Sequence, residues 1–349
     1  MATTDVAKGR SRGEHMTRHV ILITYGEPPT PAFGMQLKYS WRILLGLTRR
    51  VAPIPVWLLP VIAMSRARFR NRLWSREQYG SPLEAITRAQ AEGLHAALAL
   101  LDRDVDWRVH VAYEFRDPLL ESVLNGIPPN EAVAVLPMYV ADSAFTHAIS
   151  REAIEHWTAR SGRNRRVPVR VLPPMDEERF AELSAQHVRR VLSEHRVDGS
   201  DVALVLAAHG TLLNPPRPID TGREATERIC AGIVNRLSNN FAMVANGWLN
   251  HVYGGRWTEP PIEDALRQVV SKGYRKVVYF PYGFTADNAE SELEGRIALR
   301  GCPELTAIHL PCLNASREYL SALAQDIVED GRSVIPNAAI SGHVITGAL

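Results

Sequence analysis

The stretch Leu204-Val-Leu-Ala-Ala-His209-Gly210 runs from five apolar residues straight into a histidine and a glycine. An unbroken apolar run of this length is typical of a strand buried on both faces, the kind found in parallel sheets. His209 is therefore predicted at the carboxyl end of a strand, where open α/β sheets bind ligands. Gly210 lacks a Cβ, which would let a ligand approach the backbone. A lone histidine is more often a structural residue, so the rest of the chain must decide its role.

The same pattern occurs in the first half of the chain. His19-Val-Ile-Leu-Ile-Thr-Tyr25-Gly26 is a second apolar run, with Tyr25 in the place of His209. Each half also has a later apolar strand followed by a loop, one reaching Asp142 and the other Asp287. Strands alternate with helical patterns in both halves. The sequence predicts an internally duplicated α/β protein with two doubly wound, Rossmann-like domains of parallel sheets.

The domain boundary is predicted at Pro173-Pro174. Residues 17–172 then form the N-terminal domain, and residues 173–330 form the C-terminal domain that carries His209. Residues 1–16 are polar and expected to be disordered, and the tail 331–349 has no clear pattern. We expect the ligand between the two domains, where the strand ends face one another.

Composition excludes several classes of protein. The 349 residues include 40 Lys and Arg against 38 Asp and Glu, so the net charge of +2 does not suggest nucleic-acid binding. The chain has three widely spaced cysteines, which argue against a zinc ribbon, an iron–sulfur cluster or a disulfide framework: Cys230, Cys302 and Cys312. We therefore expect a cytoplasmic location. Nucleotide-binding, serine-hydrolase and zincin motifs are missing from the sequence.

An apolar segment is followed by closely spaced arginines. No apolar run is long enough to span a membrane, and residues 53–64, broken by Pro55 and Pro60, are expected at most to touch a membrane surface. Arginines then occupy every second position from Arg66 to Arg72. On a helix they would form two adjoining stripes, which are either solvated or a patch for ligand carboxylates or anionic lipid.

Three carboxylates follow a later strand. Asp287, Glu290 and Glu294 are spaced to line one face of a helix. The helix dipole accounts for acids in the first turn, but not for Glu294. Such a cluster repels itself unless a cation or a proton lies within it. With His209 across the cleft, the set suits a divalent metal or general acid–base chemistry.

An aromatic-rich loop lies between these elements. Trp248 and Trp257 could line a flat, apolar ligand or could belong to the core, and the sequence leaves both open. His251 is a second candidate ligand, although its loop position favours exposure to solvent.

From His19 to about Val328, the motifs together resemble the ferrochelatase family in the family's own order. The matching motifs are Leu-Ile-Thr-Tyr25-Gly-Glu-Pro28, Gly80-Ser-Pro-Leu-x-Ala-Ile-Thr-Arg-Ala-Gln90, Ala208-His209, Trp257-x-x-Pro260, Gly283-Phe-Thr-Ala-Asp287-Asn-Ala-Glu290 and Leu313-Asn314. The resemblance implies a lyase of haem biosynthesis that inserts Fe²⁺ into a porphyrin, either protoporphyrin IX or coproporphyrin III.

The resemblance also implies roles for individual residues. The family's histidine and catalytic glutamate fall on His209 and Glu290, which would contact the metal and the pyrrole protons. Asp287 and Glu294 would form a proton or metal relay. Substrate-binding positions fall on Tyr25, Trp248, Asn250, His251 and Trp257. Porphyrin and ferrous iron are then the partners, and no tightly bound cofactor is expected.

Several positions depart from the family pattern. Asn288 stands where many members have histidine, and Glu114 falls in a segment that is often basic. Two other functions stay open: a non-catalytic tetrapyrrole or haem binder, and a chelatase for another metal. The presence of both His209 and Glu290 favours an enzyme, because a binder needs no proton acceptor facing a metal.

Overall fold

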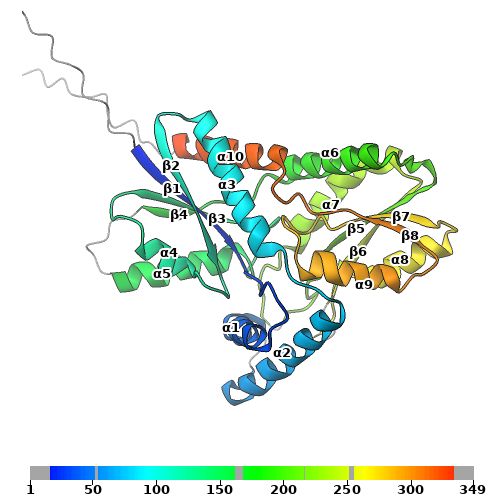
Figure 1. Ribbon diagram of the computed structural model, residues 1–349, viewed down its shortest axis with the longest axis horizontal. Helices are drawn as coiled ribbons and strands as arrows, with labels where there is room; N and C mark the ends of the chain where they lie inside the picture. Colours follow the sequence, from blue (N-terminus) through cyan, green and yellow to red (C-terminus); the bar gives the residue numbers. More distant parts are fainter. Residues whose placement is uncertain (1–15, 52–53, 162–167, 216, 251–254, 334–349) are drawn as a thin grey trace, which may run out of the picture.

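The structure is a computed structural model that describes residues 16–51, 54–161, 168–215, 217–250 and 255–333. Within these residues the strands form two parallel sheets of four strands each, in the orders β2-β1-β3-β4 and β6-β5-β7-β8 (Figure 1). The strands are β1 (Met16–Thr24), β2 (Val105–Tyr113), β3 (Ala132–Pro137), β4 (Val169–Val171), β5 (Ala203–His209), β6 (Met243–Leu249), β7 (Lys276–Phe280) and β8 (Thr306–His309).

The two strand orders are the same when the second set of four is counted from β5. The predicted duplication is therefore confirmed. β1 and β5 occupy equivalent central positions, so Tyr25, directly after β1, and His209, at the end of β5, lie at equivalent strand ends.

Helices cover both sheets and extend beyond them. The α-helices are α1 (Phe33–Val51), α2 (Leu59–Arg76), α3 (Leu83–Leu101), α4 (Leu120–Asn125), α5 (His147–Ser161), α6 (Glu177–His195), α7 (Arg223–Leu237), α8 (Ile262–Ser271), α9 (Gly295–Arg300) and α10 (Arg317–Ser333). The short helices are η1 (Val56–Leu58), η2 (Gly199–Asp201), η3 (Ser238–Asn240) and the π-helix η4 (Ala289–Glu294).

The apolar runs are buried on both faces, as their patterns predict. In β1, Val20 and Leu22 face a large core, while Ile21 and Ile23 face a second core beneath α4 and α5. Side chains alternate in this way because successive residues of a strand point to opposite faces. The large core also takes in Leu204 and Leu206 of β5, so the inner faces of both sheets share it.

Two terminal predictions need correction. Met16 was expected in the disordered N-terminal segment, but its backbone pairs with Val105 and it begins β1. The sequence places residues 331–333 in the tail, but they complete α10. This helix packs against α3, which precedes β2 in the N-terminal half. Residues 1–15 and 334–349 lie outside the described residues.

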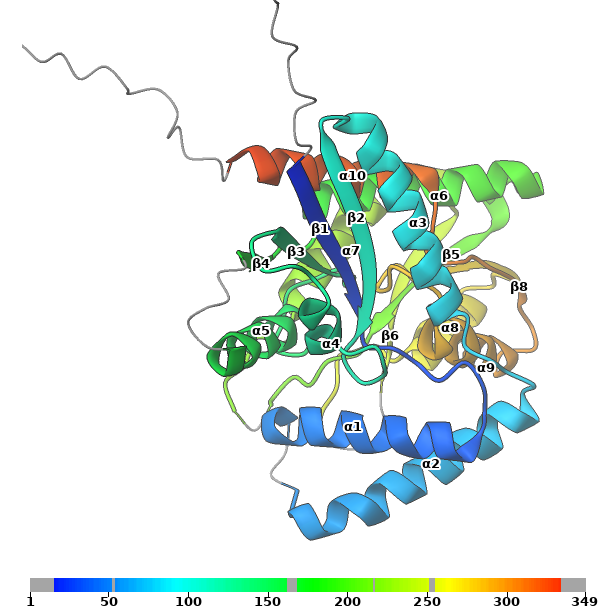
Figure 2. The same ribbon diagram turned by 60° about the vertical axis from the view of Figure 1, so that its left-hand side comes forward.

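The helices α1 and α2 form a hairpin that the sequence did not predict. They pack against each other beyond the ends toward which β1 and β2 point (Figure 2). The outer side of η1 and α2 carries exposed apolar side chains. Apolar residues therefore lie on both sides of the helix, and the sequence lacks the regular spacing of apolar residues that marks a helix buried on one side. We call α1, η1 and α2 the lip hairpin.

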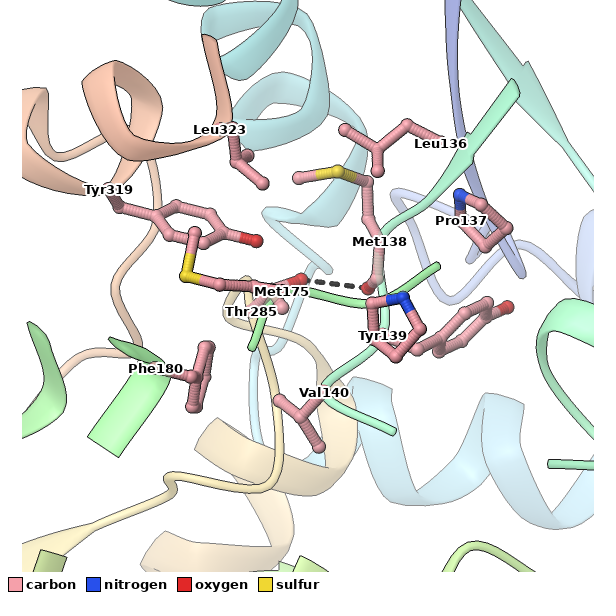
Figure 3. A pocket seen from close by; sticks show the side chains of 11 residues that line it. Leu136, Pro137, Met138, Tyr139, Val140, Met175, Phe180, Thr285, Tyr319 and Leu323 are labelled. Atoms are coloured by element: carbon pink, nitrogen blue, oxygen red, sulfur yellow. Dashed lines mark hydrogen bonds between the residues drawn. The ribbon is translucent and has the colours of Figure 1, made fainter. Parts of the chain in front are cut away.

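The two halves meet at a buried junction. The Thr285 hydroxyl donates to the Met138 carbonyl at 2.8 Å, beside an enclosed cavity of about 10 Å³ into which Tyr319 and Leu323 also project (Figure 3). Gln90 donates to the carbonyls of Thr285 and Asn314 at 3.3 and 3.1 Å. These bonds join β3, α3 and the loop after β7 across the middle of the molecule.

Replacing Thr285 with valine should lower the free energy of unfolding by about 1–3 kcal/mol, because the buried Met138 carbonyl loses its partner. Urea denaturation measures the change. Thr285→Ser is the matched control, since it keeps the hydroxyl, and it should lose clearly less stability. Equal losses for the two variants would contradict a role for this hydrogen bond.

Candidate active site

The structure brings His209 and Glu290 into direct contact. The His209 Nδ1 and Glu290 Oε2 atoms are 2.6 Å apart, although 81 positions separate the residues. The side chains are 44% and 24% exposed, so the pair lies at a surface that a ligand can reach. Phe284 stands edge-on to the imidazole, with ring centroids 6.5 Å apart. The two candidate catalytic residues therefore form one unit.

A π-helix presents the glutamate. Asn288 caps η4: its side chain accepts hydrogen bonds from the backbone N–H groups of Glu290 and Ser291, and the Ser291 hydroxyl accepts from the Asn288 N–H. The N–H of Gly295 donates to the Glu290 carbonyl, an i→i+5 bond. Such bonds widen the turn, and π-bulges are found frequently at functional sites. Glu294, four residues after Glu290, lies close enough for the two carboxyl groups to interact.

The charges of the site are coupled. Burial disfavours the imidazolium of His209, but the Glu290 carboxylate outweighs this effect, and the pKa of His209 is raised above its usual value. Burial, together with the nearby Glu290 carboxylate, raises the pKa of Glu294 to about 8. The Glu290 carboxylate thus favours a proton on His209, and Glu294 keeps its own proton at neutral pH.

The end of β1 faces the same site. Burial raises the pKa of Tyr25 well above its usual value, and the carboxylates of Glu27 and Glu290 add to this effect. Phe115 and Glu114 extend the pairing of β2 with β1, since the Phe115 N–H donates to the Tyr25 carbonyl at 3.0 Å and the Glu114 N–H to that of Thr24 at 2.9 Å. Tyr25 thus lies within electrostatic range of Glu290, across the interface between the two sheets.

The arginines of α2 divide into the two predicted stripes. Arg66 and Arg70 are partly buried, and Arg66 lies within electrostatic range of Glu290 and Glu294. The Arg66 Nε is buried and has no hydrogen-bond partner within the part of the chain that the structure describes. Arg68 and Arg72 are exposed. One stripe therefore faces the site and the other faces solvent.

Two predicted ligand residues, Trp248 and Asn250, have structural roles instead. Trp248 is 2% exposed and packs into the large core, because it lies on the inner face of β6. The Asn250 amide donates to the Thr258 carbonyl at 2.7 Å and accepts from the Thr258 hydroxyl at 3.3 Å, so it ties down a loop. A Cβ on Gly210 would clash with Asn250 and the Leu249 carbonyl, which is the reason for glycine there. Trp257 is partly buried, and His251 lies outside the described residues.

Asp287 does not join the predicted relay. Its carboxylate accepts from the Cys312 backbone N–H at 2.8 Å and from the Asn314 side chain at 2.7 Å. It holds the loop before α10 instead. The predicted face of three carboxylates assumed an α-helix that includes Asp287, but Asn288 is the N-cap and Asp287 precedes the helix. Glu290 and Glu294 alone remain as neighbours.

Few side chains that could bind a metal ion lie together in the site. Among the described residues, no group of three or more His, Cys, Asp or Glu side chains is placed to hold a metal ion. Resident metals in proteins usually have three or four protein ligands. Within the described ranges, no helix is both long and apolar enough to cross a membrane.

Sequence reasoning missed Glu27 and Tyr39. Glu27 is 2% exposed and Tyr39 5%, and both influence the pKa values of groups in the site. Glu27 follows the Tyr25-Gly26 turn directly, and a charged residue between a buried strand and a run of prolines was a signal that could have drawn attention. Tyr39 carried no comparable signal, since α1 was not predicted.

Comparison with known proteins gives the family. The family model described as Ferrochelatase matches residues 18–330. The chain belongs to the ferrochelatase family. It is 26% identical over 326 residues to a ferrochelatase of Xylella fastidiosa (strain M23), which covers 87% of this chain and 95% of that one. A ferrochelatase of Methylibium petroleiphilum is 28% identical over 324 residues, covering 87% and 85%.

A solved structure gives the same fold. CbiX, described as the terminal enzyme for biosynthesis of siroheme in denitrifying bacteria, superposes with a TM-score of 0.51 at 17% identity, over 89% of this chain and 99% of that one. The predicted fold, two chelatase-type domains with parallel sheets, is confirmed by this likeness and by the two sheets themselves.

Replacing Glu294 with glutamine should change how stability depends on pH. The folded pKa of about 8 exceeds that of an unfolded glutamate, so ionising Glu294 destabilises the fold progressively as pH rises from about 4 to 8. Glu294→Gln removes this effect. Its melting temperature relative to the parent should therefore be higher at about pH 9 than at about pH 5.

Differential scanning calorimetry at both pH values tests this prediction. Glu224→Gln, at an exposed glutamate of α7, is the control and should show little pH-dependent difference. A Glu294→Gln difference that does not vary with pH would contradict a raised pKa in the folded state.

Proposed function

We propose that this chain is a ferrochelatase, a lyase that inserts Fe²⁺ into a porphyrin during haem synthesis. One observation carries the proposal: His209 and Glu290 share a short hydrogen bond at a strand end that faces Tyr25. Membership of the ferrochelatase family supports it. A proton acceptor joined to a metal-binding carboxylate is what the reaction needs, since the ring must lose two protons as the metal enters.

The raised pKa of His209 suggests the order of steps. In the resting site a proton on His209 is held by the Glu290 carboxylate. An Fe²⁺ ion that binds to this carboxylate competes with the proton and weakens its hold. His209 then releases its proton to solvent, becomes neutral and can accept a proton from a pyrrole nitrogen. The metal therefore enters as the base becomes available.

Glu294 provides the next proton site. It is largely neutral at pH 7, so it adds little negative charge beside Glu290 before the metal arrives. A dication on Glu290 would lower the pKa of Glu294, which would then release its proton to solvent. Once the metal leaves Glu290 for the ring, the pKa of Glu294 rises again and its carboxylate can accept a pyrrole proton. Two pyrrole protons thus leave through His209 and the pair Glu290–Glu294, which balances the two charges of the metal.

Arg66 is the proposed contact for substrate carboxylates. It is directed toward the site from α2, and its Nε has no hydrogen-bond partner among the residues described. Porphyrins of this pathway carry propionates at the ring edge, and guanidinium groups pair well with carboxylates. The site favours neither protoporphyrin nor coproporphyrin on these grounds, since both carry propionates.

The lip hairpin is the proposed contact with a membrane surface. Val56 and Trp57 are each 75% exposed, and Val61 and Phe69 are 65% and 66% exposed. The exposed Arg68 and Arg72 lie on the same helix. Apolar and aromatic side chains with neighbouring basic groups are typical of interfacial helices on anionic lipid. A poorly soluble ring could enter the site from this surface, on the cytoplasmic side.

We propose that iron is substrate and that no cofactor is resident. Cys230, Cys302 and Cys312 are each buried and free. Burial raises the pKa of Cys312 well above its usual value and that of Cys230 to about 11, which disfavours the thiolates that an iron–sulfur cluster requires.

His209→Ala and Glu290→Gln should each lower the rate of metal insertion by about 10²–10⁴-fold, the usual effect of losing a general base. Porphyrin binding should remain, because neither residue is needed to hold the ring. The assay follows anaerobic Fe²⁺ insertion into protoporphyrin and coproporphyrin by loss of porphyrin fluorescence. Tight porphyrin binding without insertion by the parent protein would favour the non-catalytic binder instead.

Trp57→Glu and Val61→Glu should reduce binding to vesicles that contain anionic lipid, because each places a charge on the apolar surface. Flotation with anionic and with purely zwitterionic vesicles measures the change. Leu100→Glu is the control, since Leu100 is 70% exposed on α3. Equal binding by all three variants and the parent would contradict a contact through the lip hairpin.

A further inference from the structure

We propose that Glu27 is a positioning residue for the metal-insertion reaction: its buried carboxylate joins the lip helix α2 to the first residue of the π-helix that presents Glu290. The inference rests on the proposed function. Glu27 lies in the turn after β1 and contacts none of the reacting groups directly. It would act through the backbone of η4 and through Arg70.

Each oxygen of Glu27 has its own partner. Oε1 accepts from Arg70 Nη2 at 2.9 Å, and Oε2 accepts from the backbone N–H of Ala289 at 3.0 Å. The Glu27 side chain is 2% exposed and that of Arg70 is 13% exposed. One carboxylate therefore links the turn after β1, the helix α2 and the start of η4, which come from both halves of the chain.

Hydrogen bonds and two aromatic rings hold the Arg70 side chain in place. Its Nε donates to the Gln36 side chain at 2.8 Å, and Gln36 in turn donates to the Thr30 carbonyl at 3.0 Å. The guanidinium lies between the rings of Tyr39 and Trp74, 5.1 and 4.6 Å from their centroids. Such a group has little freedom to turn. It fixes the direction from which Glu27 is held.

The location of the bond to η4 gives it a functional consequence. Ala289 is the first residue of η4, and Glu290 is the next. A shift of the Ala289 N–H moves the backbone of Glu290 and lengthens the 2.6 Å bond to His209. Displacement of a reacting group by about 1 Å can lower a rate by ~100-fold.

A stabilising role alone explains the arrangement less well. A buried ion pair contributes little net stability, because desolvation of both charges offsets their attraction. A packed apolar pair would serve stability equally well. What a carboxylate supplies here, and an apolar side chain cannot, is a directed acceptor for the Ala289 N–H together with a fixed partner on α2.

The test compares Glu27→Gln, Arg70→Gln and the double variant E27Q/R70Q in the full-length protein. Each single variant should lower kcat for Fe²⁺ insertion by ~10- to 100-fold while changing KM for porphyrin far less. In the double variant, the amide introduced at position 27 can accept from the Ala289 N–H, and neither partner leaves a buried charge unpaired. Its kcat should therefore exceed that of either single variant.

Two controls separate positioning from stability. Ile233→Ala, on the buried face of α7, should lower the melting temperature at least as much without changing kcat. Hydrogen exchange at residues 289–294 gives a readout that does not depend on activity. Exchange should become faster in Glu27→Gln and remain unchanged in Ile233→Ala.

The outcomes distinguish this inference from the proposed function. An active parent together with a Glu27→Gln variant of unchanged kcat would overturn the positioning role alone. A loss of kcat that follows melting temperature equally in Glu27→Gln and Ile233→Ala would also overturn it. A parent that inserts no metal contradicts the proposed function and, with it, any role of Glu27 in that reaction.

Discussion

The hydrogen bond between His209 Nδ1 and Glu290 Oε2 is the interaction on which the account of this protein depends. It joins the end of the central strand β5 to the π-helix that follows β7. Each partner needs a separate structural condition. His209 needs a strand that is buried on both faces and ends where the carboxyl ends of the parallel strands meet. Glu290 needs the Asn288 cap and the wide turn of η4. The rest of the molecule holds these two elements in place.

The duplicated fold explains how one site draws on both halves. Equivalent strand ends supply Tyr25 from one sheet and His209 from the other. The two sheets share a core, and the Thr285–Met138 bond fixes their junction. Glu27 adds a further link on the side of the lip hairpin. Duplication thus produced two equivalent strand ends, of which one has a tyrosine and the other a histidine.

Much of the fold could be predicted, because apolar runs report burial directly. The runs ending at Tyr25 and His209 predicted two strands buried on both faces, and their similarity predicted the duplication. The pairing of His209 with Glu290 followed from strand ends and family motifs. Trp248 was misplaced because a tryptophan carries the same signal in a core as at a ligand surface, and only the sheet face decides.

Other features could not be predicted, because they depend on contacts between distant parts of the chain. The spacing of the carboxylates does not show where the helix begins, so the sequence predicts a shared face for Asp287, which in fact precedes the Asn288 N-cap. The bond from Ala289 to Glu27 spans 262 positions. The lip hairpin exposes apolar side chains, so its pattern did not resemble a helix packed on one side.

The most direct test of the central claim is an NMR titration of the His209 ring in the full-length protein, with and without Zn²⁺ as a redox-stable substitute for Fe²⁺. We expect the pKa of His209 to lie above the usual value for histidine in the free protein, and to be lower in Glu290→Gln and in the presence of the metal. An ordinary pKa that neither Glu290→Gln nor the metal changes would contradict the claim that His209 and Glu290 hold a proton which the incoming metal displaces.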